Sequence, residues 1–263
     1  WNSPFPQQCA NAPASVKTAA YFRRFGVTAN AQARFNGEEI TTLYCPKLAG
    51  YNFTFGLWPH YDGTTAVNGG IPQRGNLTAH LAAVAAAIDG VFPDVDHAGV
   101  VVIDWEFWYP WLIPQSDSVY VNESLRFANG DVSLAVQQWN TTSLQFMEET
   151  VKLAVRMRPK ASWGYYGRPG CYTGWANASG PPGCWPSVQV RNNALMPLWE
   201  AQTALFPSVY IGTNPKFGNK TRTPRYVADE IFETLRVKRR MKARGRPVKV
   251  IAFVWYSIFS SPC

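Results

Sequence analysis

Asp104 and Glu106 are the two residues whose type and spacing best suit chemistry. They lie in the segment Gly99–Trp111, GVVVIDWEFWYPW, which begins as an apolar run and continues among aromatic residues. Alternate residues of a β-strand point to the same face, so we expect the two carboxyl groups to lie side by side. Carboxylates this close repel, which raises the pKa of one of them. A carboxyl group with a raised pKa keeps its proton near neutral pH and can act as a general acid.

The alternative interpretation is a pair of surface acids at the end of a strand, neutralised by nearby lysines or arginines. This pair instead follows a buried apolar run, and four aromatic residues enclose it: Trp105, Phe107, Trp108 and Trp111. Because such an environment disfavours two exposed charges, we favour a functional site.

The segments around the pair alternate between strand and helix patterns. Strands are predicted over residues 39–45, 98–107, 161–166, 207–212 and 248–259. Helices are predicted over residues 76–92, 141–159, 192–205 and 225–243, and Pro197 interrupts the third. The alternation indicates βαβ units and a parallel sheet, and 263 residues suit a barrel better than a small doubly wound sheet. Active groups of such barrels lie where the strands end. The candidates there are Asp104, Glu106, Tyr165, Tyr166, Tyr210, Trp255 and Tyr256.

Two acids among aromatic residues indicate a glycosidase, since aromatic rings stack on sugar rings. Aromatic residues make up 14% of the chain, which has 11 tryptophans. There is no glycine-rich phosphate loop and no histidine or cysteine cluster typical of a metal site, so we expect no metal and no cofactor. The net charge of +8 favours anionic partners, among which acidic polysaccharide fits better than nucleic acid. The basic run at residues 236–246 is interpreted as the solvated end of a helix.

The chain carries signs of the secretory route. It has six sequons for N-glycosylation, which place their asparagines at the surface of a secreted or lysosomal protein. No apolar run is long enough to span a membrane. The six acceptors are Asn52, Asn76, Asn122, Asn140, Asn177 and Asn219.

Five cysteines fit the same compartment. Cys171 and Cys184 enclose a loop rich in glycine and proline, and a disulfide between them is the favoured pairing. The pairing of Cys9, Cys45 and Cys263 stays open, because an odd number of cysteines leaves at least one without a partner in this chain.

The segment VIDWEFWYPW resembles the catalytic signature of the hyaluronidase family of glycoside hydrolases. Three further segments resemble the same family in the same order: residues 68–81, 146–172 and 198–212. The resemblance covers nearly the whole chain.

This resemblance implies a distorted TIM-like (β/α) barrel, with residues 1–263 as a single glycosidase domain. It implies endo-hydrolysis of hyaluronan, with chondroitin as a second substrate, by a retaining and substrate-assisted mechanism. Glu106 would be the general acid and then the general base, while Asp104 would orient the acetamido group of the substrate. Tyr166 and Tyr210 match tyrosines that hold this group and the sugar. Further candidates for sugar contact are Tyr165, Trp108, Tyr109 and Tyr256.

The chain departs from the family pattern in two ways. Tyr109 stands where the signature has an arginine. The strand that opens the barrel is almost absent before Cys9, and the final strand does not follow residue 263, so we expect a barrel incomplete at both termini, with the partner of Cys9 unknown. Two alternatives follow: a hydrolase that prefers chondroitin or chitin, or a non-catalytic glycosaminoglycan-binding or allergen-like protein.

Overall fold

The computed structural model describes residues 24–31, 34, 36–45, 54–113, 118–171, 182–210, 222–241 and 247–254. Within them the strands are β1 (Ile40–Cys45), β2 (His60–Asp62), β3 (Thr65–Val67), β4 (Val100–Trp105), β5 (Ser162–Tyr165), β6 (Ala204–Leu205) and β7 (Lys249–Val250). The helices are η4 (Pro72–Arg74), α2 (Leu77–Val91), α3 (Val119–Phe127), α4 (Val132–Met157), α5 (Pro186–Ala194), α6 (Met196–Ala201) and α7 (Arg222–Arg240). None of these helices combines the length and apolar character that a membrane crossing requires.

The strands form a parallel wall in the order β1–β4–β5, followed by the parallel pair β6–β7. The backbone of Thr203 donates to Trp163 at 2.9 Å, and Tyr166 forms a parallel bridge with Phe206, so β6 continues the wall beside β5. Each parallel step is connected through a helix: α2 before β4, α4 before β5, α5 and α6 before β6, and α7 before β7. This succession is that of a (β/α) barrel, and the strands of the described residues do not close into a ring.

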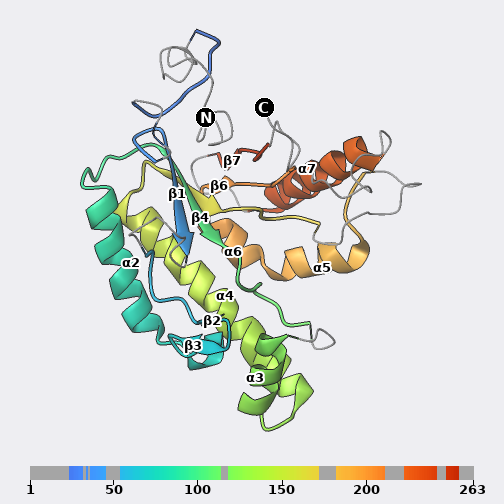
Figure 1. Ribbon diagram of the computed structural model, residues 1–263. Helices are drawn as coiled ribbons and strands as arrows, with labels where there is room; N and C mark the ends of the chain where they lie inside the picture. Colours follow the sequence, from blue (N-terminus) through green and yellow to red (C-terminus); the bar gives the residue numbers. More distant parts are fainter. Residues whose placement is uncertain are drawn as a thin grey trace.

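The helices cover the outside of this wall (Figure 1). In that view α2 and α4 lie side by side near β1 and β4, and α7 packs against α5 and α6. The hairpin of β2 and β3 lies below β1 and β4 in this view, on the side to which their arrowheads point.

Side-chain caps begin three of the helices. Asn76, Ser118 and Asp131 each accept a hydrogen bond from the backbone three residues later, which satisfies an otherwise unpaired amide. The cap at Asp131 starts α4 nine residues before the predicted start at 141. The left-handed backbone of Asn129 and Gly130 turns the chain just before this cap, a turn signal in the sequence that the helical periodicity alone did not use.

The prediction of an interrupted helix over residues 192–205 was confirmed as far as Ala201, whereas the bounds of the strand predicted over 207–212 were wrong. Pro197 lies in the first turn of a new helix, α6, where its missing amide hydrogen costs nothing, so two helices replace one. The strand then starts earlier than predicted, at Ala204, and continues only as single bridges at Phe206 and Ser208. The short β6 is buried on both sides, so its residues show no alternation that distinguishes a strand from a helix.

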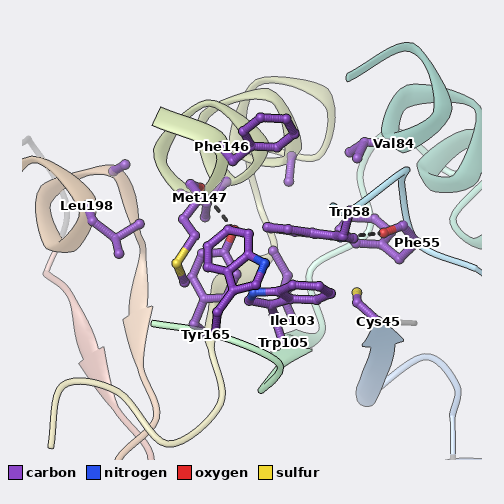
Figure 2. Close-up of a cluster of buried hydrophobic side chains, with 14 of the residues drawn as sticks. Cys45, Phe55, Trp58, Val84, Ile103, Trp105, Phe146, Met147, Tyr165 and Leu198 are labelled. Carbon is purple, nitrogen blue, oxygen red and sulfur yellow. Dashed lines mark hydrogen bonds between the residues drawn. The ribbon is translucent and has the colours of Figure 1, made fainter. Parts of the chain in front are cut away.

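The sheet separates two apolar layers. The outer layer lies between strands and helices, and contains Leu43 and Cys45 of β1, Val101, Ile103 and Trp105 of β4, and Trp163 and Tyr165 of β5. Figure 2 shows part of it, with Trp58 stacked on Trp105 at 4.6 Å between ring centroids and Met147 and Phe146 coming from α4. Stacked aromatic pairs of this kind contribute about 1 kcal/mol beyond their buried area.

The inner layer lies on the opposite face of the strands. It contains Val102, Ala204 and Phe206, with Tyr166 and Phe253 packed against them. The wall is tight here because a Cβ atom at Gly164 would lie 2.1 Å from the carbonyl oxygen of Ala204, so only glycine lets β6 approach β5. The inner face is the one that leads to the candidate site.

Candidate active site

Asp104 lies on the inner face near the carboxyl end of β4. Val101, Ile103 and Trp105 point to the helices, whereas Val102 belongs to the inner layer, so alternation directs Asp104 inward as well. Glu106 comes one residue after the strand and is exposed. The structure thus places the half-buried Asp104 in β4 and the exposed Glu106 just after it, at the carboxyl end of the parallel wall.

The pKa of the Asp104 carboxyl group is raised to about 7. Burial is the largest cause, the negative charge of Glu106 adds to it, and the positive charge of Arg168 opposes it. The sequence predicted one raised pKa in the pair and did not decide which residue carries it. Burial of Asp104 within β4 raises its pKa, whereas Glu106 comes after the end of this strand and is exposed.

Tyrosines flank Asp104 on the inner face. Tyr44 of β1 pairs with Asp104 in the parallel register. On the other side Ile103 pairs with Tyr165, so the next position sets Tyr166 beside Asp104, and the amide of Tyr166 donates to the carbonyl oxygen of Ile103 at 3.0 Å. Tyr44, Asp104 and Tyr166 therefore form a row across three strands, the inner row.

Tyr210 joins this group from the segment after β6. Its ring lies 6.0 Å from that of Tyr166, and Phe253 packs against both rings. The hydroxyl of Tyr166 lies 3.1 Å from the Ser208 hydroxyl. Burial raises the pKa of both tyrosines, and the charges of Asp104 and Glu106 raise it further. The two predicted tyrosines therefore lie within the electrostatic field of the acid pair and keep their hydroxyl protons as donors.

Two of the predicted sugar-contact residues lie in the outer core instead. Tyr165 is fully buried and donates its hydroxyl hydrogen to the carbonyl oxygen of Met147 at 2.9 Å. Trp108 is also buried, and its indole donates to the carbonyl oxygen of Pro59 at 2.6 Å. Neither ring has a free face for a sugar, so both predictions were wrong.

Tyr109 is exposed, as a sugar-contact residue requires, and it has two planar neighbours. Its ring stacks on Trp111 at 5.2 Å, and the guanidinium of Arg168 lies 4.4 Å from its ring centre. Tyr256 is outside the described residues.

The sequence reasoning missed Tyr44, Ser208 and Arg168. Tyr44 could have been found from its position in the predicted strand. Side chains alternate between the two faces over Thr41–Cys45, which puts Tyr44 on the face opposite Leu43 and Cys45. Nothing local marks Ser208 or Arg168, since both reach the site only through the pairing of β5 with its neighbours.

The disulfide between Cys171 and Cys184 is present, as the sequence favoured, and it follows the inner wall after β5. Cys45 is a buried free thiol, whereas Cys9 and Cys263 are outside the described residues. Of the sequons, Asn76 and Asn122 are exposed. Asn140 is half-buried and accepts a hydrogen bond from the amide of Leu112, while the other three acceptors, Asn52, Asn177 and Asn219, are outside the described residues.

A parallel (β/α) wall with two carboxyl groups and tyrosines at the strand ends is an arrangement typical of the glycoside hydrolase class. The family model for hyaluronidases, glycoside hydrolase family 56, matches residues 1–260. The chain therefore belongs to the hyaluronidase family.

Individual relatives agree with this assignment. Hyaluronidase PH-20 of Mus musculus is 33% identical over 97% of this chain and 49% of its own length. The hyaluronidase of Apis mellifera is 34% identical over 89% of this chain and 61% of its own length. The chain thus spans about half to three fifths of the length of these relatives.

Solved structures match as well. The structure of bee venom hyaluronidase in complex with a hyaluronic acid tetramer has a TM-score of 0.78 to this chain at 29% identity, covering 100% of this chain and 80% of the other. This match confirms the predicted distorted TIM-like barrel.

Proposed function

We propose that this protein is an endo-acting glycoside hydrolase that cleaves β-linked N-acetylhexosamine bonds in hyaluronan by a retaining, substrate-assisted mechanism. The observation that carries the proposal is the placement of Asp104 and Glu106 at one strand end, next to Tyr166 and Tyr210. Residues 1–263 would act as a single domain.

The acid pair supplies one proton. With a pKa of about 7 at Asp104, the two carboxyl groups together keep a proton in mildly acidic solution. Glu106 is exposed and can present this proton to a glycosidic oxygen. Asp104 then becomes the carboxylate that accepts the N–H of the substrate's acetamido group.

The reaction follows from this division. The acetamido carbonyl oxygen attacks the anomeric carbon, the glycosidic bond breaks, and the proton of Glu106 goes to the leaving oxygen. Water then attacks the anomeric carbon of the cyclic intermediate and gives its proton to the Glu106 carboxylate. Because the substrate supplies the nucleophile, Asp104 can lie beside the acid instead of across the sugar ring.

The tyrosines hold the reacting group. The hydroxyl groups of Tyr166 and Tyr210 remain protonated because burial raises their pKa, so they can donate hydrogen bonds that orient the acetamido oxygen toward the anomeric carbon before it attacks. Tyr109 is exposed at the edge of the site and can contact a sugar where Trp111 and Arg168 do not cover its ring.

Hyaluronan is the favoured polymer for two reasons. The chain carries a net charge of +8, which attracts an acidic polysaccharide, and a structural relative was solved with a hyaluronic acid tetramer. Chondroitin and chitin also carry the acetamido group that the mechanism needs. Secretion is the route that we propose, because Asn76 and Asn122 present sequons at the surface.

Release of reducing ends from hyaluronan, chondroitin and chitin oligomers tests the proposal. Glu106→Gln should lower kcat by about 10²–10⁴-fold, the usual contribution of a general acid. Glu39→Gln is the matched control, since Glu39 is an exposed glutamate just before β1, at the opposite end of the wall, and this variant should cleave like the wild type.

Each outcome has a meaning. Cleavage of chitin oligomers alone would replace hyaluronan as the substrate and keep the mechanism. Binding of hyaluronan by the wild type without cleavage of any polymer would favour the non-catalytic, glycosaminoglycan-binding alternative. Equal cleavage by the wild type and Glu106→Gln would contradict the role of the acid.

A further inference from the structure

Arg168 is a buried cation beside the acid pair. It is 2% exposed and follows β5 after Gly167, whose left-handed backbone (φ of 66°) turns the chain toward β4. Its Nη2 atom donates to the carbonyl oxygen of Trp105 at 3.1 Å and lies 3.5 Å from that of Trp108. These two carbonyl groups flank Glu106 in the sequence.

The guanidinium of Arg168 is not neutralised by any carboxylate of the described residues within ion-pair distance. Its Nη1 atom is buried without a hydrogen-bond partner in that part of the chain, and the face of the group lies against the Tyr109 ring. Arginine keeps its charge under all ordinary conditions. A buried charge without a counter-ion is unfavourable, so its persistence here suggests a use in the site.

Several ionisable groups surround Asp104, and Arg168 is the cation among those that act on its titration. Glu106 adds negative charge from the same strand end, and the buried Cys45 thiol of β1 interacts with Asp104 as well. Tyr166 and Tyr210 face it from β5 and β6 as neutral hydroxyl groups. Burial and the charge of Glu106 raise the pKa of Asp104, and the positive charge of Arg168 opposes both effects.

We propose that Arg168 is a positioning residue that draws the proton shared by the acid pair away from Asp104 and toward Glu106, while its hydrogen bond to the strand end fixes the turn that carries Glu106. This inference rests on the proposed function for its consequence, and on the burial, hydrogen bonds and charge of Arg168 for its cause. Without the cation, the deeper Asp104 would hold the proton more strongly, and Glu106 would carry it less often toward a glycosidic oxygen.

Two variants separate the charge of Arg168 from its hydrogen bond. Arg168→Gln keeps amide donors and removes the charge, whereas Arg168→Lys keeps the charge. The titration of Asp104 is followed by carboxyl ¹³C NMR, with the signal assigned by its loss in Asp104→Asn. We expect the midpoint to rise by about one pH unit in Arg168→Gln and to stay within about 0.3 unit of the wild type in Arg168→Lys.

Arg158→Met is the matched control, because Arg158 is equally buried at 3% exposure but precedes β5, at the other end of the wall. It should lower the melting temperature and leave the Asp104 midpoint in place. A folded Arg168→Gln variant with the wild-type midpoint would overturn the proposal.

A second measurement uses the wild type alone and needs no variant at Arg168. The Nε–H signal of Arg168 should shift with pH at the same midpoint as Asp104, and this shift should vanish in Asp104→Asn. A signal that does not move between pH 5 and 9 would contradict the coupling.

Activity gives the consequence. The base limb of kcat/KM should move up by about one pH unit in Arg168→Gln, with Arg168→Lys close to the wild type. If no polymer is cleaved, the proposed function fails while the NMR titrations still decide the role of Arg168.

Discussion

The two ends of the parallel wall each hold one buried arginine, and the two arginines differ in their partners. Before β5, Arg158 donates from Nε to the carbonyl oxygen of Phe92 at 2.6 Å and pairs with Asp89 at 2.9 Å. After β5, Arg168 donates to the carbonyl oxygen of Trp105, and no carboxylate of the described residues pairs with it.

This difference separates a structural cation from one suited to a site. The charge of Arg158 is balanced, and its hydrogen bonds tie the end of α2 to the end of α4. The charge of Arg168 is left to act on a carboxyl group that titrates near neutral pH. Residue type and burial are the same at both ends, so the partners alone distinguish the two roles.

The largest effect on stability is expected at the end before β5. Arg158→Met should reduce the free energy of unfolding by about 2–3 kcal/mol, because it leaves the carbonyl oxygen of Phe92 unpaired and removes the ion pair with the exposed Asp89. Thermal melting should show a fall of roughly 5–10 °C, with kcat/KM on hyaluronan unchanged. A loss of activity at a temperature where this variant is fully folded would contradict a purely structural role for Arg158.

Adjacent tyrosines allow a comparison of the two faces of one strand. Tyr166→Phe should lower kcat/KM about tenfold, as expected for one lost hydrogen bond to the reacting group, with little change in melting. Tyr165→Phe should instead destabilise the protein by about 1 kcal/mol and leave kcat/KM intact, because its hydroxyl donates to the carbonyl oxygen of Met147 in the core. Melting curves and initial rates on both variants check this, and the reverse pattern would show that the faces are misassigned.

A pH-dependent effect concerns the stability of the end that carries the acids. The folded pKa of Asp104 is about 7 against an ordinary value of 3.8, so the folded state binds more protons than the unfolded state between these values, and stability falls as pH rises through this window. Asp104→Asn removes this dependence. It should match the wild type near pH 4 and be about 1–2 kcal/mol more stable at pH 8, a figure discounted for the partial exposure of Asp104.

Denaturant unfolding at the two pH values measures this difference. Glu230 also has a pKa raised to about 7 by burial, and it is present in both proteins, so the difference between the two isolates Asp104. Equal stability of the wild type and Asp104→Asn at pH 8 would show that burial does not disfavour the charged form of Asp104.

Much of the fold followed from local patterns. The apolar run before Asp104 predicted β4, and the alternation of patterns predicted the succession of strands and helices. The glycine- and proline-rich segment between Cys171 and Cys184 predicted the disulfide. The failures fall where local pattern is ambiguous. Residues 204–205 form a strand that is two residues long and buried on both sides. They form a strand only because Gly164 lets β5 come close enough to them.

The candidate site divides in the same way. Asp104 and Glu106 are neighbours in the sequence, so their spacing alone revealed the pair. Tyr165 and Tyr166 could not be separated by type, and the face of the sheet on which each lies decided that one belongs to the core and the other to the inner row.

The sequence by itself determined the family, the acid pair and the succession of strands and helices, because these depend on residues close together in the chain. Only the tertiary structure decided which acid carries the raised pKa and where the cation beside it comes from. Both depend on depth and on contacts between residues about 60 positions apart, since Arg168 reaches Trp105 only when β5 pairs with β4. Electrostatics in a protein interior depend on distance in space, and the order of residues does not specify that distance until the sheet has formed.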